Sequence, residues 1–334
     1  MDRKRRHHRV TEGIVRLVGL VGIFLAACTP HEPRTPKAVF IIVDGIPADV
    51  IEATDTPAID AVSAIGGYTR AYIGGAIGDI SESPTVSSVG YASLVTGTWA
   101  NKHNVWDNNI SAPNYAYWDI FRIAKEHDPT LKTAVFSTWT DNRTKLLGNG
   151  LAEAGGDKLD YYFDLLEAGF ERLSHEEQSQ QIRQIDTLSA INASDYIAAQ
   201  GPELSWVYLQ YTDDVAHLYG DSPEFTNAVR FMDRQIGRVW DSIRERQARF
   251  NEDWLLIVTT DHGRDAETGM DHGGQSERER TIWIATNSDH LNDRFGQLPG
   301  IVDILPSIAT HLDLDIPTAI ERQLDGESFI DQGP

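Results

Sequence analysis

The amino-acid sequence predicts an α/β fold in which a mainly parallel central sheet is covered by helices on both faces. Apolar, β-branched runs alternate along the chain with stretches of helical spacing, which is the order expected of such a sheet. Three of the apolar runs end directly in clusters of aspartate and histidine. Because ligands bind at the carboxyl ends of strands in open α/β sheets, these clusters are candidates for one shared site.

The predicted elements follow one another in a regular order. The first apolar run, residues 38–43, is typical of a strand buried on both faces. Similar runs follow at residues 133–136, 206–211, 255–259 and 281–285. Helical patterns cover residues 57–65, 89–95, 117–127, 176–199, 223–249 and 301–312. The stretch 141–201 is polar, mostly helical and without a clear strand, so we expect it to form a small cap over the sheet edge.

The N-terminus has the layout of an export signal. A basic opening precedes an apolar run, residues 17–27, that is too short to span a bilayer as a helix. The run ends in Leu25-Ala26-Ala27-Cys28, which resembles the bacterial lipobox, whose cysteine becomes the lipidated first residue of the mature chain. We therefore expect residues 1–27 to be a lipoprotein signal peptide and residues 28–37 a tether, with lipid on Cys28 anchoring an exported protein to a bacterial membrane. The alternative is an ordinary signal peptide with a chance cysteine.

Composition limits the partners. The net charge is −21 and becomes more negative once the basic N-terminal segment is removed, so the surface repels nucleic-acid backbones and no nucleic-acid polymer is expected as a partner. A small anionic substrate would need local positive charge, which bound divalent cations supply. The chain has 1 cysteine, which excludes an internal disulfide and thiolate metal ligands in the mature domain.

The candidate metal ligands are carboxylates and imidazoles that follow predicted strands: Asp44, Asp213, His217, Asp261, His262 and His272. Each cluster alone has an ordinary explanation, namely a turn at Asp-Gly, a surface pair four residues apart, or a loop leaving a strand. Their convergence at one sheet edge favours a metal site instead. Mixed carboxylate and imidazole ligands are what zinc accepts when thiolates are absent.

The segment 83–97 supplies a candidate nucleophile. Residues 88–96 are apolar at helical spacing, so Ser87 is expected at a helix N-terminus, where free amides and the helix dipole favour an anion. A hydroxyl bound to a metal ion loses its proton more easily, which removes the need for a histidine base. The alternative is that Ser87 is only an N-cap.

Taken together, these residues resemble the alkaline phosphatase superfamily, most closely its branch of type I phosphodiesterases and nucleotide pyrophosphatases, from residue 38 to about residue 329. The resemblance implies an alkaline phosphatase-like catalytic domain at 38–334. Leu94-Val95-Thr96-Gly97 matches the end of the family's nucleophile helix. The family places the nucleophile ten residues before that glycine, which selects Ser87. Thr85 and Ser88 are the alternatives if the register is shifted.

The resemblance also implies two divalent metal ions, expected to be Zn²⁺. One ligand set has one carboxylate and two imidazoles: Asp213, His217 and His272. The other has two carboxylates and one imidazole: Asp44, Asp261 and His262. Ser87 would also contact a metal and would attack phosphorus to form a phosphoseryl intermediate.

Two departures from the family pattern bear on the substrate. Sulfatases of this superfamily need proline and arginine after the nucleophile, whereas Ser87 is followed by Ser88-Val89-Gly90-Tyr91, so sulfate esters are disfavoured. Nucleotide pyrophosphatases usually place an asparagine three residues after the nucleophile to hold a phosphate oxygen, and this chain has Gly90 there. The candidates to replace that asparagine are Asn101, Arg143 and Lys145.

The sequence therefore predicts a metal-dependent hydrolase of small phosphoric esters, with phosphodiesterase or nucleotide pyrophosphatase activity favoured. An alkaline phosphomonoesterase on the same site is the alternative among enzymes, because the sequence does not show whether the pocket has room for a second ester group. A non-catalytic metal-binding lipoprotein is the alternative from another class. The clustered charge and the serine at the nucleophile position disfavour it.

Overall fold

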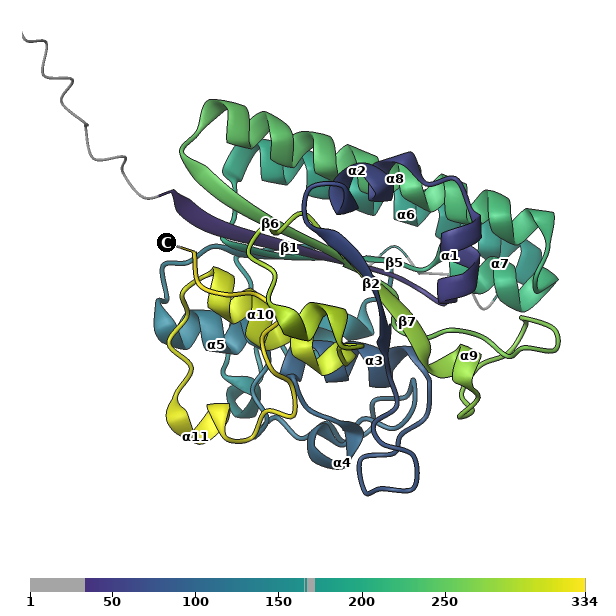
Figure 1. The fold of residues 1–334 in the computed structure, drawn as a ribbon, viewed down its shortest axis with the longest axis horizontal. Coiled ribbons are helices and arrows are strands. Elements are labelled where there is room, and N and C mark those ends of the chain that lie inside the picture. Colours follow the sequence, from purple (N-terminus) through teal and green to yellow (C-terminus); the bar gives the residue numbers. More distant parts are fainter. Residues whose placement is uncertain (1–33, 165, 167–171, 334) are drawn as a thin grey trace, which may run out of the picture. The chain divides into compact units, whose positions relative to one another are not determined.

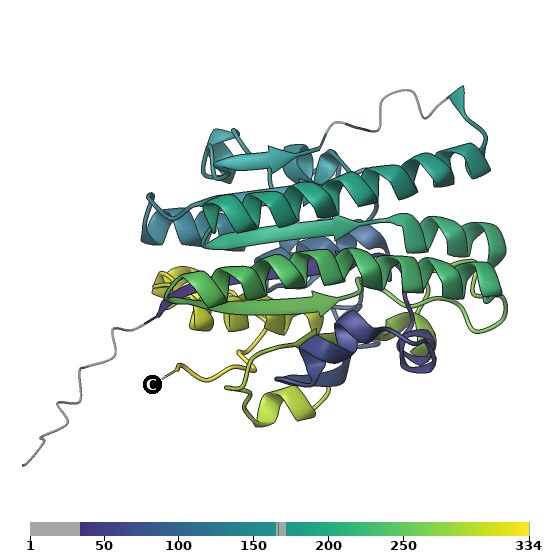
Figure 2. The same ribbon diagram turned by 90° about the horizontal axis from the view of Figure 1, so that it is seen from above.

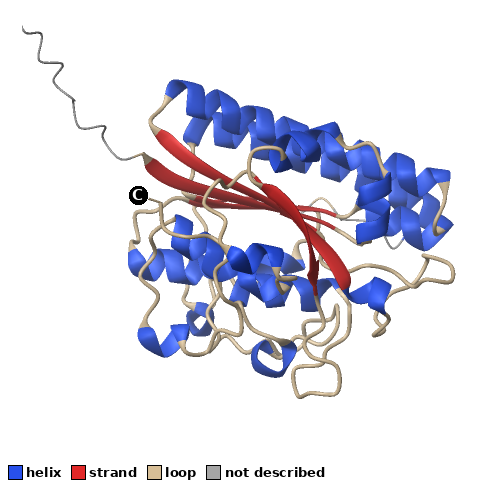
Figure 3. Ribbon diagram, viewed as in Figure 1, coloured by secondary structure: helices blue, strands red, loops and turns tan. Residues whose placement is uncertain are grey.

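The computed structural model describes residues 34–164, 166 and 172–333. Its central layer is a seven-stranded sheet with the order β2-β7-β6-β1-β5-β3-β4 (Figure 3). The strands are β1 (Thr35–Val43), β2 (Gly67–Tyr72), β3 (Thr133–Ser137), β4 (Tyr161–Phe163), β5 (Leu204–Leu209), β6 (Glu252–Thr259) and β7 (Thr281–Thr286). β7 is antiparallel to both β6 and β2, and the other pairs are parallel. The predicted mainly parallel sheet is confirmed.

β1 lies in the middle of the sheet between β5 and β6. Its side chains alternate between two apolar cores: Phe40 and Ile42 contribute to one, and Val39 and Ile41 to the other. Burial on both faces explains why this strand is a continuous apolar run in the sequence rather than an alternating one. Because β1, β5 and β6 are parallel, their carboxyl ends lie together at one edge of the sheet.

Helices cover both faces, as predicted (Figure 1). On one side are α1 (Ala48–Ala53), α2 (Pro57–Ser63), α6 (His175–Gln200), α7 (Tyr211–Tyr219) and α8 (Pro223–Arg249). On the other are α3 (Ser87–Thr96), α5 (Ile120–His127) and α10 (Ile304–His311). Figure 2 shows α6 and α8 lying side by side along the sheet. The short helices α4 (Ala100–His103), α9 (Glu277–Arg280) and α11 (Thr318–Glu321) lie in connections.

The two long helices begin where local capping chemistry places them. Ser174 accepts a hydrogen bond from the N–H of Glu177, whose side chain bonds back to Ser174, so α6 starts in a capping box. The Ser222 side chain accepts from the N–H of Phe225 at the start of α8, and Pro223 occupies the first turn. These caps explain why the predicted starts of the two helices, at residues 176 and 223, lie within one residue of the observed ones.

The expectation of a strandless cap at residues 141–201 is wrong. This stretch contains β4, which pairs with β3 as an edge strand of the sheet. It also contains α6, which packs on α8, β3 and β5 as part of the helical layer. The polar composition reflects a long helix with one face exposed to solvent. β4 has three residues, too few to give a detectable apolar pattern.

The tether predicted at residues 28–37 is too long at its end, because residues 35–37 already belong to β1 and pair with β6. The other N-terminal predictions fall outside the described residues. Residues 1–33, including Cys28, are not described, so the signal peptide and the lipid anchor stay predictions. Within the described part of the chain, no helix combines the length and the apolar character that crossing a membrane requires.

Candidate metal centre and active site

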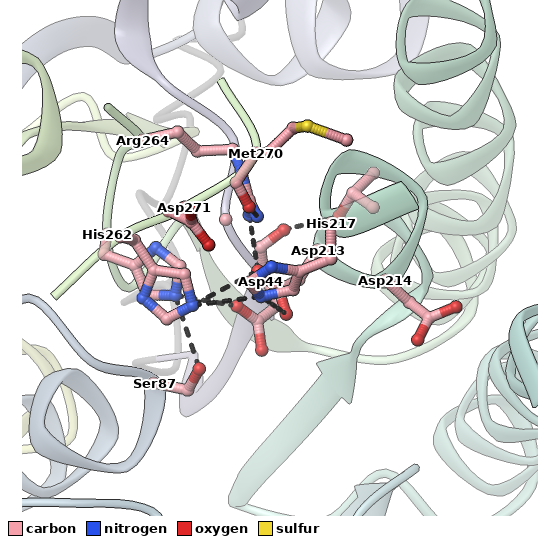
Figure 4. Close-up of polar contacts among 12 residues, drawn as sticks. Asp44, Ser87, Asp213, Asp214, His217, His262, Arg264, Met270 and Asp271 are labelled. Carbon is pink, nitrogen blue, oxygen red and sulfur yellow. Dashed lines mark hydrogen bonds and ion pairs between the residues drawn. The ribbon is translucent and has the colours of Figure 1, made fainter. Parts of the chain in front are cut away.

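The carboxyl ends of three parallel strands bring the predicted ligands together. Asp44 directly follows β1, Asp213 lies in the first turn of α7 after β5, and Asp261 follows β6. In Figure 4 the side chains of Asp44, Asp213, His217 and His262 converge on one small volume. Asp214, next to Asp213, points away, and its Oδ1 lies 3.3 Å from His175 Nε2.

The first cluster is built around His262. Its Nε2 atom lies 3.2 Å from Asp44 Oδ1 and 3.3 Å from Asp261 Oδ2. The N–H of Gly45 donates to Asp261 Oδ1 at 3.0 Å. All three side chains are buried, and neither Asp44 Oδ1 nor Asp261 Oδ2 has a hydrogen-bond partner. Buried carboxylate oxygens without a partner are costly, so these two atoms and the imidazole fit a bound cation.

The second cluster joins Asp213, His217 and His272. His217 Nε2 lies 3.3 Å from Asp213 Oδ2 and 3.2 Å from His272 Nε2. His272 Nε2 lies 3.8 Å from Asp213 Oδ1, and its Nδ1 faces the carbonyl oxygen of Thr85 at 2.9 Å. The rings of His262 and His272 stack with centroids 3.7 Å apart, so the two clusters are continuous. His262 can belong to either cluster, since one of its ring nitrogens also lies close enough to Asp213 and His272 for the three side chains to share one ion.

The electrostatics of the first cluster show crowding of negative charge. Burial and the neighbouring Asp44 carboxylate raise the pKa of Asp261 well above its ordinary value. Burial opposes a charge on His262, but the carboxylates of Asp261 and Asp44 outweigh it and raise the pKa of His262 to about 9. A proton on this cluster therefore compensates charge that a divalent cation would compensate better.

The second cluster is less negative. Burial would raise the pKa of Asp213, yet its hydrogen bond with His217 and the positive charge of Arg264 hold that pKa well below the ordinary value. Burial and the neighbouring His262 lower the pKa of His272 to about 4. His272 is thus neutral near pH 7, which is the form that binds a metal.

Ser87 lies beside these clusters at the N-terminus of α3. Its Oγ atom is 3.3 Å from His262 Nε2. The N-cap position is Val86, so Ser87 is the first residue of the helix and the alternative of a simple N-cap is wrong. Ser87 also lines a cavity of about 110 Å³. The other residues of that cavity are Asp44, Asn108, Trp139, Tyr208, Gln210 and Asp213.

The two rival hydroxyls face elsewhere. Thr85 Oγ1 donates to the carbonyl oxygen of Gly274 at 2.9 Å and accepts from the N–H of Gly273. Ser88 Oγ donates to the carbonyl oxygen of Asp107 at 2.8 Å. Of the three candidates, Ser87 is the one whose hydroxyl faces the candidate ligands.

The structure reveals side chains at the site that sequence analysis missed. The Asp44 carboxylate accepts hydrogen bonds from the hydroxyls of Tyr91 and Tyr208, and Arg264 donates to Asp213. Tyr91 lies one helical turn after Ser87, and Tyr208 carries a hydroxyl inside a buried strand. These positions are weak indications in the sequence that both residues belong to the site. Arg264 left none, because its partner lies 51 residues away.

Gly90 has no room for a side chain that could bind phosphate. A Cβ atom on Gly90 would lie 2.7 Å from the carbonyl oxygen of Asp261, so α3 packs directly on that residue. The proposed substitutes are also elsewhere: Arg143 pairs with Asp164 and Lys145 with Asp141, and neither they nor Asn101 line the Ser87 cavity. Asn108 does line it.

Comparisons with known proteins agree with this geometry. The family described as type I phosphodiesterase / nucleotide pyrophosphatase matches residues 38–290. No curated protein matches the chain. Many solved structures share its fold, among them three at low sequence identity. The phosphonate monoester hydrolase of Agrobacterium radiobacter has a TM-score of 0.60 at 14% identity, covering 90% of this chain and 78% of that one.

Human ectonucleotide pyrophosphatase / phosphodiesterase 5 has a TM-score of 0.56 at 13% identity, covering 84% of this chain and 96% of that one. A putative sulfatase from Bacteroides thetaiotaomicron has a TM-score of 0.58 at 12% identity, covering 88% and 73%. At these identities the similarity shows the fold alone, whereas the family match spans most of the chain. The chain therefore belongs to the type I phosphodiesterase / nucleotide pyrophosphatase family and is a hydrolase of phosphoric esters.

Proposed function

We propose that this chain is a metal-dependent phosphodiesterase or nucleotide pyrophosphatase in which Ser87 attacks phosphorus. One observation carries the proposal. Ser87 and Asp44 line the same cavity. Asp44 Oδ1 and Asp261 Oδ2 are buried oxygens without hydrogen-bond partners. A nucleophile beside carboxylates that each have one oxygen free of hydrogen bonds is the arrangement that metal-assisted phosphoryl transfer needs.

The ligand chemistry favours two divalent ions, expected to be Zn²⁺. The donors are carboxylate oxygens and imidazole nitrogens, a set suited to zinc. We assign Asp44, Asp261 and His262 to one ion, and Asp213, His217 and His272 to the other, with His262 close enough to Asp213 and His272 to take part in the second set. When bound, such ions supply positive charge that lowers the pKa of a coordinated hydroxyl and stabilises the charge on phosphate oxygens.

The chain's own residues position the reaction. Ser87 Oγ attacks phosphorus in line, the ester oxygen departs on the opposite side, and water then hydrolyses the phosphoseryl intermediate. The Oδ1 atom of Asn108 accepts the N–H of Ser88 at 3.1 Å, which fixes the amide beside the nucleophile. We assign its Nδ2 group as the donor to a non-bridging phosphate oxygen, the role that position 90 does not fill.

We also propose that the protein is exported and held at a bacterial membrane by lipid on Cys28, with small phosphate esters as substrates. The support is the lipobox-like sequence before Cys28. Anchoring by lipid requires no membrane-spanning helix in the catalytic domain.

The test of the nucleophile compares three single variants of the purified protein on bis(4-nitrophenyl) phosphate. Ser87→Ala should abolish the phosphoenzyme and lower kcat by at least about 1,000-fold, since loss of an activated nucleophile removes the covalent route. Metal content should be unchanged. Thr85→Ala and Ser88→Ala are the controls, and each should keep at least a tenth of wild-type activity.

A dead Thr85→Ala with an active Ser87→Ala would show that the nucleophile is misassigned. Parallel assays on 4-nitrophenyl phosphate, a phosphonate monoester and 4-nitrophenyl sulfate identify the preferred ester. A higher kcat/KM on the monoester than on the diester would favour the phosphomonoesterase alternative. A protein that binds metal but turns over none of the four would be the non-catalytic lipoprotein.

A further inference from the structure

In both Asp44 and Asp213, the two carboxylate oxygens have different hydrogen-bond partners. Asp44 Oδ2 accepts hydrogen bonds from the hydroxyls of Tyr91 and Tyr208, the latter at 2.6 Å. Its Oδ1 has no hydrogen bond and lies 3.2 Å from His262 Nε2. One oxygen is therefore held by the protein, and the other faces the candidate metal position.

Asp213 also has one oxygen bound to a fixed donor, although that oxygen, Oδ1, lies 3.8 Å from His272 Nε2 as well. Its Oδ1 accepts from Arg264 Nη1 at 2.5 Å, and its Oδ2 lies 3.3 Å from His217 Nε2 (Figure 4). The backbone of Gly45 leaves room for this pair, because a Cβ atom there would lie 2.6 Å from Arg264 Nη1 and 2.8 Å from Asp213 Oδ1.

These donors are fixed in place by their own surroundings. Arg264 is fully buried, and its Nε and Nη2 atoms donate to the carbonyl oxygens of Gly269 and Met270 at 2.7 and 2.6 Å. It thereby fixes the loop that leads to His272. Tyr91 and Tyr208 are buried with ring centroids 4.9 Å apart. None of the three can leave its aspartate without losing packing or other hydrogen bonds.

The donors differ in charge, so the two ligand sets differ in charge as well. Asp44, Asp261 and His262 offer two carboxylates to a cation, and the tyrosine hydroxyls beside Asp44 are neutral. Asp213, His217 and His272 offer one carboxylate, whose charge is opposed by the guanidinium of Arg264. With Asp44 and Asp261 ionised and the imidazoles neutral, which are the forms that bind a metal, Coulombic attraction for a divalent cation is stronger at the first set.

We propose that Tyr91, Tyr208 and Arg264 are positioning residues that fix which oxygen of Asp44 and Asp213 faces a metal, and that they make the Asp44 set the first to fill. This inference rests on the two-ion site proposed above. Groups that hydrogen-bond to metal ligands tune affinity by about 10- to 100-fold. The enzyme should accordingly pass through a stable state with one ion at the Asp44 set.

The test is a metal titration rather than an activity assay. The full-length protein is freed of metal with a chelator and titrated with Zn²⁺ against a chromophoric competitor, and with Co²⁺ for its visible absorption. The wild type should show two classes of site that differ in Kd by at least about 10-fold. Asp44→Asn should remove the tighter class, and Asp213→Asn the weaker one.

The positioning residues are tested by variants that keep the side-chain size. Tyr208→Phe and Tyr91→Phe, made singly, should each weaken the tighter class by about 10-fold or more and change its Co²⁺ spectrum. Arg264→Lys keeps the positive charge but loses the several N–H donors of the guanidinium. It should raise the Kd of the weaker class of site and leave that of the tighter class unchanged. Tyr68→Phe is the matched control, because Tyr68 donates to Glu52 at the surface, and both Kd values should be unchanged.

The outcomes separate this inference from the proposed function. Two bound ions with Asp44→Asn removing the weaker class would overturn the filling order while leaving the two-ion site intact. Unchanged Kd values in both tyrosine variants, with thermal stability lowered, would show that Tyr91 and Tyr208 stabilise the fold but do not affect metal binding. A wild-type protein that binds neither Zn²⁺ nor Co²⁺ would overturn the metal-dependent function itself.

Discussion

Gly90 is the position where one methyl group tests how closely α3, the helix that begins at Ser87, packs on Asp261. A Cβ atom at this position would lie 2.7 Å from the carbonyl oxygen of Asp261 and 3.0 Å from Asp261 Cβ. Both distances are shorter than ordinary van der Waals contact, and the first involves a backbone atom. Gly90→Ala therefore forces α3 away from Asp261 or shifts Asp261 itself.

The expected magnitude follows from two opposing effects. Replacing glycine by alanine in an unobstructed helix stabilises it by about 0.5–1 kcal/mol. Overpacking a tight core costs about 1–3 kcal/mol. For Gly90→Ala we expect a net loss of roughly 1 kcal/mol in the free energy of unfolding. A displacement of Asp261 near 1 Å should also lower kcat/KM by about 100-fold.

The assay combines urea unfolding with kcat/KM on bis(4-nitrophenyl) phosphate. Gly296→Ala is the control, because a Cβ atom at Gly296 would meet nothing within 4 Å. That variant should match the wild type in kcat/KM and should be at least as stable as the wild type. If Gly90→Ala were as stable and as active as Gly296→Ala, the close packing of α3 on Asp261 would not govern the site.

Three further predictions concern the metal, the pH dependence of stability and the anchor. Chelation should abolish turnover, and added Zn²⁺ should restore it; full activity of a protein shown to contain no metal would contradict this. Burial raises the pKa of Asp186 to about 7, although its carboxylate accepts the N–H groups of Gln210 and Tyr211. Because unfolded aspartate titrates near pH 4, the free energy of unfolding should fall as pH rises from about 4 to about 7, and Asp186→Asn should lose this component in matched urea titrations. Cys28→Ser should release the protein from the membrane fraction; a processed but still membrane-bound variant would rule out lipid on Cys28.

The order of the long helices and buried strands, and the sheet edge where the candidate site lies, followed from the sequence alone. Parallel strands buried on both faces must be continuous apolar runs, and a polar residue such as Asp44 at the end of such a run stands out. The same reasoning placed Asp213 and Asp261 at the same sheet edge, which the structure confirms. Ser87 was selected by the family's ten-residue spacing to Gly97 and by its expected position at a helix start, and the structure has α3 beginning at Ser87.

The strands that were missed lacked such local signals. β2 is half exposed and β4 has only three residues, so neither forms an apolar run, and both are strands because they pair with β7 and β3. The antiparallel direction of β7 is likewise set by its partners. Strand pairing at an edge is decided by hydrogen bonds to distant residues, which composition does not encode.

The surroundings of the candidate ligands were decided by tertiary structure as well. Tyr208 and Arg264 reach Asp44 and Asp213 across 164 and 51 residues of chain. Local spacing determines which residue types stand at a strand end. Which oxygen of a carboxylate remains free for a cation depends on donors brought from other elements, and only the packed fold brings them there.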